Sequence, residues 1–149
     1  MTDTTVSAEL GRLLDGFFQA VSFRPGQRPR YDRIPALFVP DGWLIRGGAG
    51  APEISTVPQF VASRQHLFDA GRLTAFEEVE SAAVTEVFGA VAHRFSTYAK
   101  RGVRDGEPFA GDGVISTQFI RTPAGWRMTS MAWDDERPGL EIPARYRPG

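Results

Sequence analysis

Cysteine is absent from this chain of 149 residues, and that absence removes several kinds of chemistry at once. Without cysteine the protein has no disulfide, no thiolate nucleophile and no thiolate metal ligand. Asparagine is absent too, so there is no acceptor for N-glycosylation. Because a protein without disulfides suits a reducing compartment, we expect this one to be cytoplasmic.

Excess charge and long hydrophobic runs are also missing. The 17 Lys and Arg and the 18 Asp and Glu leave a formal net charge of −1, which gives no global attraction to nucleic acid or anionic lipid. No apolar stretch approaches the roughly 20 residues that a membrane-spanning helix needs. We therefore expect neither nucleic acid nor a membrane as a partner. Lys100 is the sole lysine beside 16 arginines, a bias typical of GC-rich bacterial genomes.

Histidine is scarce, which limits metal and nucleophilic chemistry. His66 and His93 have no second histidine at metal-ligand spacing, so we predict no metal site and no cofactor. The Gly-x-Ser-x-Gly elbow of many hydrolases is missing. The glycine-rich stretch 47–52 lacks the Gly-Lys-Ser/Thr ending of a phosphate loop and is interpreted as a flexible connection. Carboxylates remain as the means for acid–base chemistry.

The first seventy residues follow a helical period. Apolar residues recur at helical spacing over 6–21 and predict an amphipathic helix that Ser7 caps and Pro25-Gly26 ends. Asp32 is interpreted as the cap of a second, short helix. The capping box Thr56–Gln59 opens a third helix.

From residue 73 onward the apolar period changes to two, which is typical of strands. Strands are predicted at 43–45, 73–88, 91–99, 109–121 and 126–133. Gly111 and Gly113 favour bends, because glycine permits bulges and kinks. These patterns predict an α+β fold in which three N-terminal helices pack on a strongly curved mixed or antiparallel sheet that encloses a pocket. We expect one domain over 1–149, ending in a Pro-rich tail at 138–149.

Five strings in the second half of the chain resemble an uncharacterised bacterial branch of the nuclear transport factor 2-like superfamily. They are Ala92–Tyr98, Ser116–Phe119, Gly125–Met128, Trp133–Arg137 and Ile142–Tyr146. The resemblance implies a cone-shaped, cystatin-like fold, a pocket at the mouth of the cone, and a homodimer through the sheet. It implies no single activity, because the superfamily includes ketosteroid isomerases, dehydratases, polyketide cyclases and transport factors.

Acidic and polar side chains alternate on the first two long strands. Glu78 and Glu80 lie two residues apart and share a face, where repulsion and burial would raise the pKa of at least one carboxyl. That is how a general base is prepared for neutral pH, although two solvated carboxylates are the alternative. Arg94 and Tyr98 share a face of the next strand, and His93 points the other way. The turn length decides which of them meets the glutamates.

These positions give the first candidate residues. We predict Glu80 and His93 as catalytic residues, and Glu78, Arg94 and Tyr98 as ligand-binding residues. A buried arginine facing carboxylates would either neutralise them or bind an anionic ligand. An ordinary cross-strand ion pair is the alternative for Arg94.

Four further residues complete the predicted site. Asp134 is a catalytic candidate, because some superfamily enzymes place an acid on the last strand; the alternative is that it holds the C-terminal tail. Tyr31 stands where some dehydratases of the superfamily keep polar pocket residues. Arg46 stands near where isomerases of the superfamily carry a catalytic Asp, which disfavours steroid isomerase chemistry and predicts contact with an acidic ligand. Trp133 is predicted to line the pocket, with a structural role as the alternative.

Together these observations predict a protein that binds a small-molecule ligand of unknown identity. We expect a cofactor-independent lyase or isomerase that acts on a small carbonyl-bearing organic compound. The alternative is a non-catalytic dimeric module that binds a ligand or another protein. The burial of the carboxylates separates the two, because a catalytic base must lie inside a cavity that holds little water.

Overall fold

The computed structural model describes residues 2–149 and has the α+β architecture that the pattern predicts. One six-stranded sheet has the order β2-β1-β6-β5-β4-β3. The strands are β1 (Phe38–Arg46), β2 (Glu53–Thr56), β3 (Leu73–Phe88), β4 (Val91–Arg104), β5 (Glu107–Thr122) and β6 (Gly125–Asp135). Neighbouring strands are antiparallel except β1 and β6, which run parallel, so the sheet is mixed.

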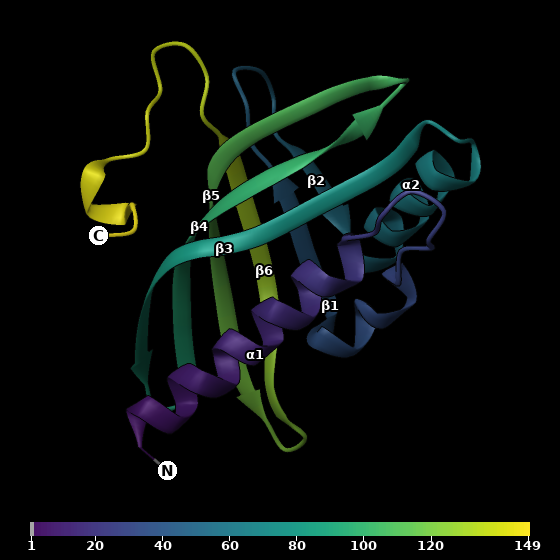
Figure 1. Ribbon diagram of the computed structural model, residues 1–149. Coiled ribbons are helices and arrows are strands. Elements are labelled where there is room, and N and C mark those ends of the chain that lie inside the picture. Colours follow the sequence, from purple (N-terminus) through teal and green to yellow (C-terminus); the bar gives the residue numbers. More distant parts are fainter. Residues whose placement is uncertain (1) are drawn as a thin grey trace.

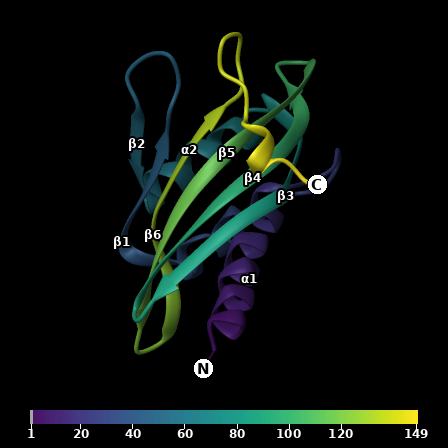
Figure 2. The same cartoon turned by 90° about the vertical axis from the view of Figure 1, so that its left-hand side faces the viewer.

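Two α-helices cover the concave face of the sheet. Helix α1 (Asp3–Val21) runs diagonally across it, and α2 (Val57–Asp69) lies at the end where the sheet is widest (Figures 1 and 2). The predicted second helix is wrong: the chain forms two 3-10 turns instead, Tyr31–Arg33 and Pro35–Leu37. Pro35 explains the break, because its ring has no N–H and would clash with the carbonyl of Tyr31 in a continuous helix.

The helix ends follow local capping chemistry. The cap of α1 is Thr2 and not Ser7, which lies inside the helix; the Thr2 hydroxyl accepts the backbone N–H of Thr5 at 3.1 Å. The predicted capping box of α2 is confirmed. The Thr56 hydroxyl accepts the Gln59 backbone N–H at 3.2 Å, and the Gln59 side chain accepts the Thr56 backbone N–H at 2.9 Å. The reciprocal bonds fix where α2 begins, and so which of its side chains face the sheet.

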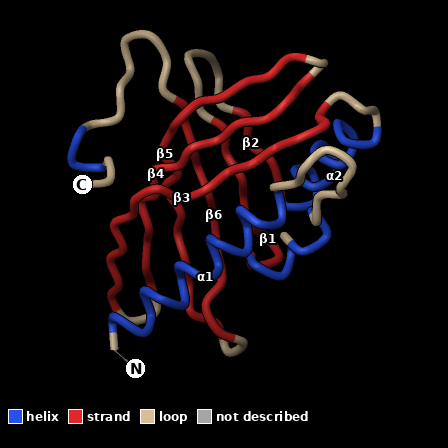
Figure 3. Tube along the Cα trace, viewed as in Figure 1, coloured by secondary structure: helices blue, strands red, loops and turns tan. Residues whose placement is uncertain are grey.

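Strands β3, β4 and β5 bend sharply near their middle, which makes the sheet concave (Figure 3). Strand β4 continues to Arg104 instead of ending at residue 99. The turn that follows is the pair Asp105-Gly106, both with positive φ (52° and 79°), which is the preferred geometry of a two-residue hairpin. The longer hairpin extends the wall of the sheet beyond the helices.

A register shift in β3 decides which side chains point inward. The two-residue turn at Gly89-Ala90 pairs Glu86 with His93, on the outer face of the sheet. The shift between Glu80 and Ala82 then pairs Glu80 with Tyr98, so the alternation reverses. Beyond this bulge the even-numbered residues of both strands share the concave face.

The core fills the narrow end of the curved sheet. Fully buried side chains of α1 pack there against those of β5 and β6. They are Leu10, Leu14, Ile115, Trp126, Met128 and Met131. The wide end, beyond Phe17, is left for the cavity described below.

The C-terminal tail lies on the outer face of the sheet, at the upper left of Figure 1. The Tyr146 ring packs on Phe95 with ring centroids 4.9 Å apart, and the Thr97 hydroxyl donates to the Tyr146 carbonyl at 2.6 Å. Arg147 holds Asp112 and Glu136 by ion pairs of 2.7 and 2.8 Å. The tail therefore leaves the concave face open.

The bend gives a stability prediction for the two glycines of β5. A β-carbon on Gly113 would overlap the Tyr98 phenol and lie 2.5 Å from the Asp134 carbonyl oxygen. We expect Gly113→Ala to lower the free energy of unfolding by about 1–3 kcal/mol through overpacking. Gly111→Ala is the matched control, because the nearest atom to its β-carbon would be Lys100 Cε at 4.0 Å. Urea denaturation of both variants measures the difference, and equal stabilities would contradict the close packing at Gly113.

Candidate functional site

A cavity of about 450 Å³ lies at the wide end of the sheet, under α1 and α2. Its size falls within the range of pockets that hold small organic ligands. Its apolar wall comes from both helices and the facing strands, with Phe17, Phe60, Ile115 and Trp133 among its members. Trp133 meets the Phe60 ring edge-on with centroids 6.0 Å apart. The hollow predicted from the sequence is therefore present, and Trp133 lines it.

Glu78 is the one carboxylate that β3 directs into this cavity. Its backbone N–H donates to the Ser22 hydroxyl at 3.1 Å, which fixes the strand beside the end of α1. Within residues 2–149, no cationic nitrogen lies within 4.0 Å of its carboxylate. Burial raises the pKa of Glu78 to about 7 against the opposing charges of Lys100 and Arg64. At neutral pH the group can therefore both accept and release a proton.

A hydrogen-bonded network lies beside Glu78. Lys100, its cross-strand neighbour, donates to Asp135 at 2.7 Å, and the Tyr98 hydroxyl donates to the other Asp135 oxygen. Burial acts to raise the pKa of Asp135, but the hydrogen bonds from Lys100 and Tyr98 outweigh it and hold that pKa below its usual range. Burial together with the Asp135 hydrogen bond raises the pKa of Tyr98. Lys100 is therefore held by Asp135 and does not pair closely with Glu78.

Helix α2 places a cation across the cavity from the sheet. Phe60, Arg64 and Leu67 recur at helical spacing and all line the cavity. The Arg64 guanidinium lies over the Phe60 ring, 5.1 Å from its centroid. Tyr31 lies nearby: burial raises the pKa of its hydroxyl, and the charge of Arg64 partly opposes that. The hydroxyl therefore stays protonated at neutral pH and can act as a donor.

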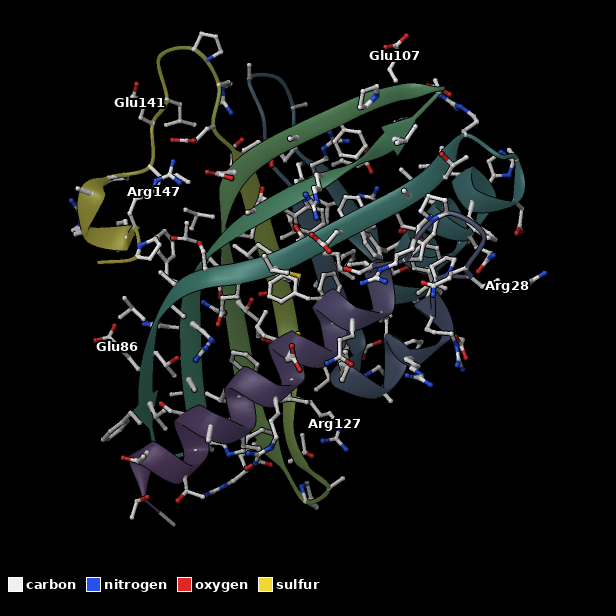
Figure 4. All side chains as sticks on the ribbon, in the orientation of Figure 1. Arg28, Glu86, Glu107, Arg127, Glu141 and Arg147 are labelled. Atoms are coloured by element: carbon white, nitrogen blue, oxygen red, sulfur yellow. The ribbon has the colours of Figure 1, made fainter. Side chains whose placement is uncertain are left out.

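The mouth of the cavity carries charged side chains of both signs, with Asp105 and Glu107 beside the arginines. Arg46 and Arg104 line it, and together with Arg64 they also line an adjoining outer pocket of about 420 Å³. Glu107 lies at the tip of the β4–β5 hairpin above the mouth (Figure 4). The predicted ligand residues Tyr31, Arg46 and Glu78 are therefore brought to one cavity.

Glu80 and Arg94 lie deeper under α1 and neutralise one another. The Arg94 guanidinium holds the Glu80 carboxylate through two hydrogen bonds of 2.6 and 3.0 Å, and Ser96 donates to it at 2.6 Å. Arg94 also donates to Thr85 at 2.7 Å. Gly11 of α1 leaves room for this cluster, since a β-carbon there would lie 3.5 Å from the guanidinium. Neither charged group lines the cavity.

His93 and Asp134 also lie away from the cavity. His93 pairs with Glu86 at 2.8 Å, on the outer side of β3 where Figure 4 shows Glu86. Asp134 is bound by Arg137 at 2.6 Å and sits beside Gly47. Strand alternation explains the second case, because Asp135 and not Asp134 shares a face with Trp133. The residues predicted as catalytic are therefore not brought together.

Among the described side chains of residues 2–149, no group of three or more His, Asp or Glu could hold a metal ion. No helix in the same range is long and apolar enough to cross a membrane.

Solved structures share this arrangement of a bent sheet with helices on its concave face. A nuclear transport factor 2-like superfamily protein from Salmonella enterica superposes with a TM-score of 0.74 over 95% of this chain and 99% of that one, at 16% identity. A protein of unknown function with a cystatin-like fold from Nostoc punctiforme superposes with a TM-score of 0.67 over 90% and 92%, at 14% identity. The chain has the nuclear transport factor 2-like fold.

A third structure with the nuclear transport factor 2-like fold comes from Streptomyces avermitilis and is provisionally described as a dehydratase. It superposes with a TM-score of 0.69 over 91% of this chain and 99% of that one, at 16% identity. No protein-family model and no curated protein matches the chain. At these identities the likeness establishes the fold and leaves the chemistry to the residues of the cavity.

Sequence reasoning missed three residues that matter to this nuclear transport factor 2-like cavity: Arg64, Lys100 and Asp135. Arg64 follows Phe60 by four residues, so a charge on the apolar stripe of α2 was a usable signal. Lys100 lies two residues after Tyr98 and shares its face, as strand alternation predicts. Asp135 could not be preferred over Asp134 without the register of β6.

Replacement of Glu78 by glutamine is expected to change how stability depends on pH. In the unfolded chain the carboxyl ionises near pH 4.5, whereas burial keeps it protonated up to about pH 7 in the native protein. Between those values the native state binds more protons, so the free energy of unfolding falls as the pH rises. The Glu78→Gln variant lacks this fall. Its free energy of unfolding, relative to that of the native protein, should therefore rise by about 3 kcal/mol from pH 4 to pH 8.

Urea denaturation at both pH values measures this gain. Glu77→Gln is the matched control, because its side chain is 51% exposed on the outer face and pairs with Arg101. A Glu78→Gln variant whose stability follows the same pH dependence as the native protein would show that Glu78 ionises normally.

Proposed function

We propose that the protein binds a small carbonyl-bearing organic compound in this cavity and acts on it as a cofactor-independent lyase or isomerase. The observation that carries the proposal is Glu78, a carboxylate inside an apolar cavity whose burial raises its pKa to about 7. A general base works best when its pKa lies near the working pH, because it is then both ionised and basic enough. The same fold in a protein provisionally described as a dehydratase supports a lyase.

The proposed reaction uses three groups of the cavity. The Glu78 carboxylate removes a proton from the carbon next to the carbonyl, and the electron pair moves onto the carbonyl oxygen. The Tyr31 hydroxyl, which burial keeps protonated at the cavity wall, donates to the oxygen as its charge grows. Lys100 is fixed by Asp135 and adds a positive field. Glu78 then returns its proton to another carbon, as an isomerase does, or to a departing group, as a lyase does.

The residues outside the cavity have supporting roles in this scheme. Glu80 is fully engaged by Arg94 and Ser96, and the cluster supports the wall beneath α1. Tyr98 holds Asp135, which in turn holds Lys100, so Tyr98 acts as a positioning residue. His93 and Asp134 have no part in the proposed step.

A general-base probe tests the proposal without knowledge of the substrate. Nitrobenzisoxazole opens when a base removes its ring C–H proton and the N–O bond breaks, which releases a coloured phenolate. We expect the native protein to accelerate the opening, with a rate that rises with pH and levels off above about pH 7, where Glu78 is ionised. Glu78→Gln should reduce the rate by about 10²-fold or more.

Glu77→Gln serves again as the control, since it removes a carboxylate one residue away on the exposed side of the strand. It should keep the native rate and the native pH profile. If Glu78→Gln opens the probe as fast as Glu77→Gln does, Glu78 is not the base and the enzymatic proposal fails.

A second candidate function is a non-catalytic dimeric module that binds a ligand or a protein. Exposed apolar side chains on the outer face of β3 and β4 favour it: Val84 is 47% exposed, Phe88 85% and Val91 53%. A hydrophobic patch on a sheet is typical of a protein interface. We propose that a second copy of the chain covers this patch, in either function.

The patch gives a prediction about assembly. Phe88→Asp places a charge at the centre of the proposed contact and is expected to convert a dimer into a monomer, because burial of an unpaired charge is costly. Sedimentation equilibrium measures the mass of both proteins. Glu77→Gln, on the outer face toward the other end of β3, is the control and should leave the mass unchanged. A native protein that is already monomeric, or a Phe88→Asp dimer as tight as the native one, would contradict the proposal.

A further inference from the structure

Three arginines line both the inner cavity and the adjoining outer pocket. Arg64 comes from α2, Arg46 from the end of β1 and Arg104 from the end of β4. They are far apart in the sequence, so only the fold brings them together. Burial lowers the pKa of Arg64; the charges of Arg46 and Arg104 also lower it, while Tyr31 and Glu78 act in the opposite direction.

These arginines form no close ion pair, although Glu53, Asp105 and Glu107 also line the two spaces. Among the described side chains, no carboxylate oxygen lies within 4.0 Å of the guanidinium nitrogens of Arg46 or Arg64. Arg104 approaches Asp105 only at 4.0 Å, and Asp105 is already held by Arg72 through bonds of 2.9 and 3.2 Å. Arg46 and Arg104 are exposed and Arg64 is partly buried, so an anion can reach all three guanidinium groups.

Several other partly buried arginines are paired. Arg94, Arg137 and Arg147 each hold a carboxylate at 2.6 to 2.8 Å. Arg64 is also partly buried but holds no carboxylate among the described side chains. A guanidinium group presents a planar fork of donors that matches an oxyanion, and the ring of Phe60 holds the Arg64 group in place.

We propose that Arg64, with Arg46 and Arg104, forms a subsite for an oxyanion group of the ligand, a carboxylate or a phosphate. The inference rests on the proposed function, because it names the substrate class of the same cavity. The ligand would then carry its anionic group at the mouth and its apolar, reactive part inside, near Glu78. Arg64 and Glu78 line the same cavity, so one small molecule can reach both.

Two dyes of nearly the same shape test the subsite directly. Anilinonaphthalene sulfonate carries an oxyanion, and phenylnaphthylamine is its neutral counterpart; both fluoresce when they enter an apolar pocket. We expect Arg64→Met to weaken binding of the sulfonate dye about tenfold or more and to leave binding of the neutral dye unchanged. Fluorescence titration at moderate salt measures both affinities.

The controls separate the subsite from other binding surfaces. Arg101→Met removes an arginine that is 74% exposed on the outer face, and it should change neither dye. Phe88→Asp tests whether the dyes bind the exposed apolar patch. Arg46→Met is a second variant in case Arg64→Met does not fold, and it should weaken the sulfonate dye in the same sense. Equal loss of both dyes, or no loss of the sulfonate dye, would overturn the proposal.

Displacement of the sulfonate dye then identifies the oxyanion. Benzoate and phenyl phosphate present a carboxylate and a phosphate on the same ring, and toluene presents neither. If benzoate displaces the dye from the native protein but not from Arg64→Met, the ligand carries a carboxylate. If phenyl phosphate behaves in this way, the ligand carries a phosphate. If toluene displaces the dye as well as both anions do, the anionic subsite is excluded.

The dye experiment and the nitrobenzisoxazole experiment can contradict the two proposals separately. Glu78→Gln should bind the sulfonate dye at least as tightly as the native protein, because it removes a negative charge from the cavity. A protein that binds the dye through Arg64 but does not open nitrobenzisoxazole would keep the subsite and lose the catalytic proposal. A protein that opens nitrobenzisoxazole through Glu78 but does not bind the sulfonate dye through Arg64 would support the base and contradict the subsite.

Discussion

The bulge at Ser81 in strand β3 sets the chemistry of the concave face. From the Gly89-Ala90 turn up to this point, the even-numbered residues of β3 face outward; beyond it they face inward. The shift turns Glu78 and Glu80 toward Tyr98 and Lys100, and it bends the strand so that helices can lie across it. Without the extra residue, both carboxylates would lie on the wet outer face.

Two carboxylates turned inward by one bulge then meet different surroundings. Glu80 lies under α1 beside Arg94 and Ser96, which satisfy both of its oxygens. Glu78 lies further along the strand, where α1 ends and the cavity begins, and its neighbour Lys100 is held by Asp135. The same residue type is therefore structural at one position and a proposed base two residues away. Arg46, Arg64 and Arg104 line the same cavity and form the proposed oxyanion subsite.

The sequence was sufficient for the fold class and for much of the element order, because hydrophobic period and capping chemistry are local properties. The capping box at Thr56 and the change of period at residue 73 are examples. It also placed Tyr31, Arg46, Glu78 and Trp133 in one pocket. The preference for Glu80 over Glu78, and for Asp134 over Asp135, depended on register, which a bulge or one residue of strand alternation reverses. No local pattern reports such a shift, nor which arginine finds a carboxylate partner.

The ionisation of Glu78 inside the folded protein decides whether it can serve as the base. A carbon NMR titration of the glutamate side-chain carboxyls, with the Glu78 signal assigned by its absence in Glu78→Gln, follows this one group. We expect the Glu78 carboxyl to titrate with a midpoint of about 7. A midpoint near the ordinary value of 4.5 would show that water or an unrecognised partner stabilises the charge, and would contradict the proposed base.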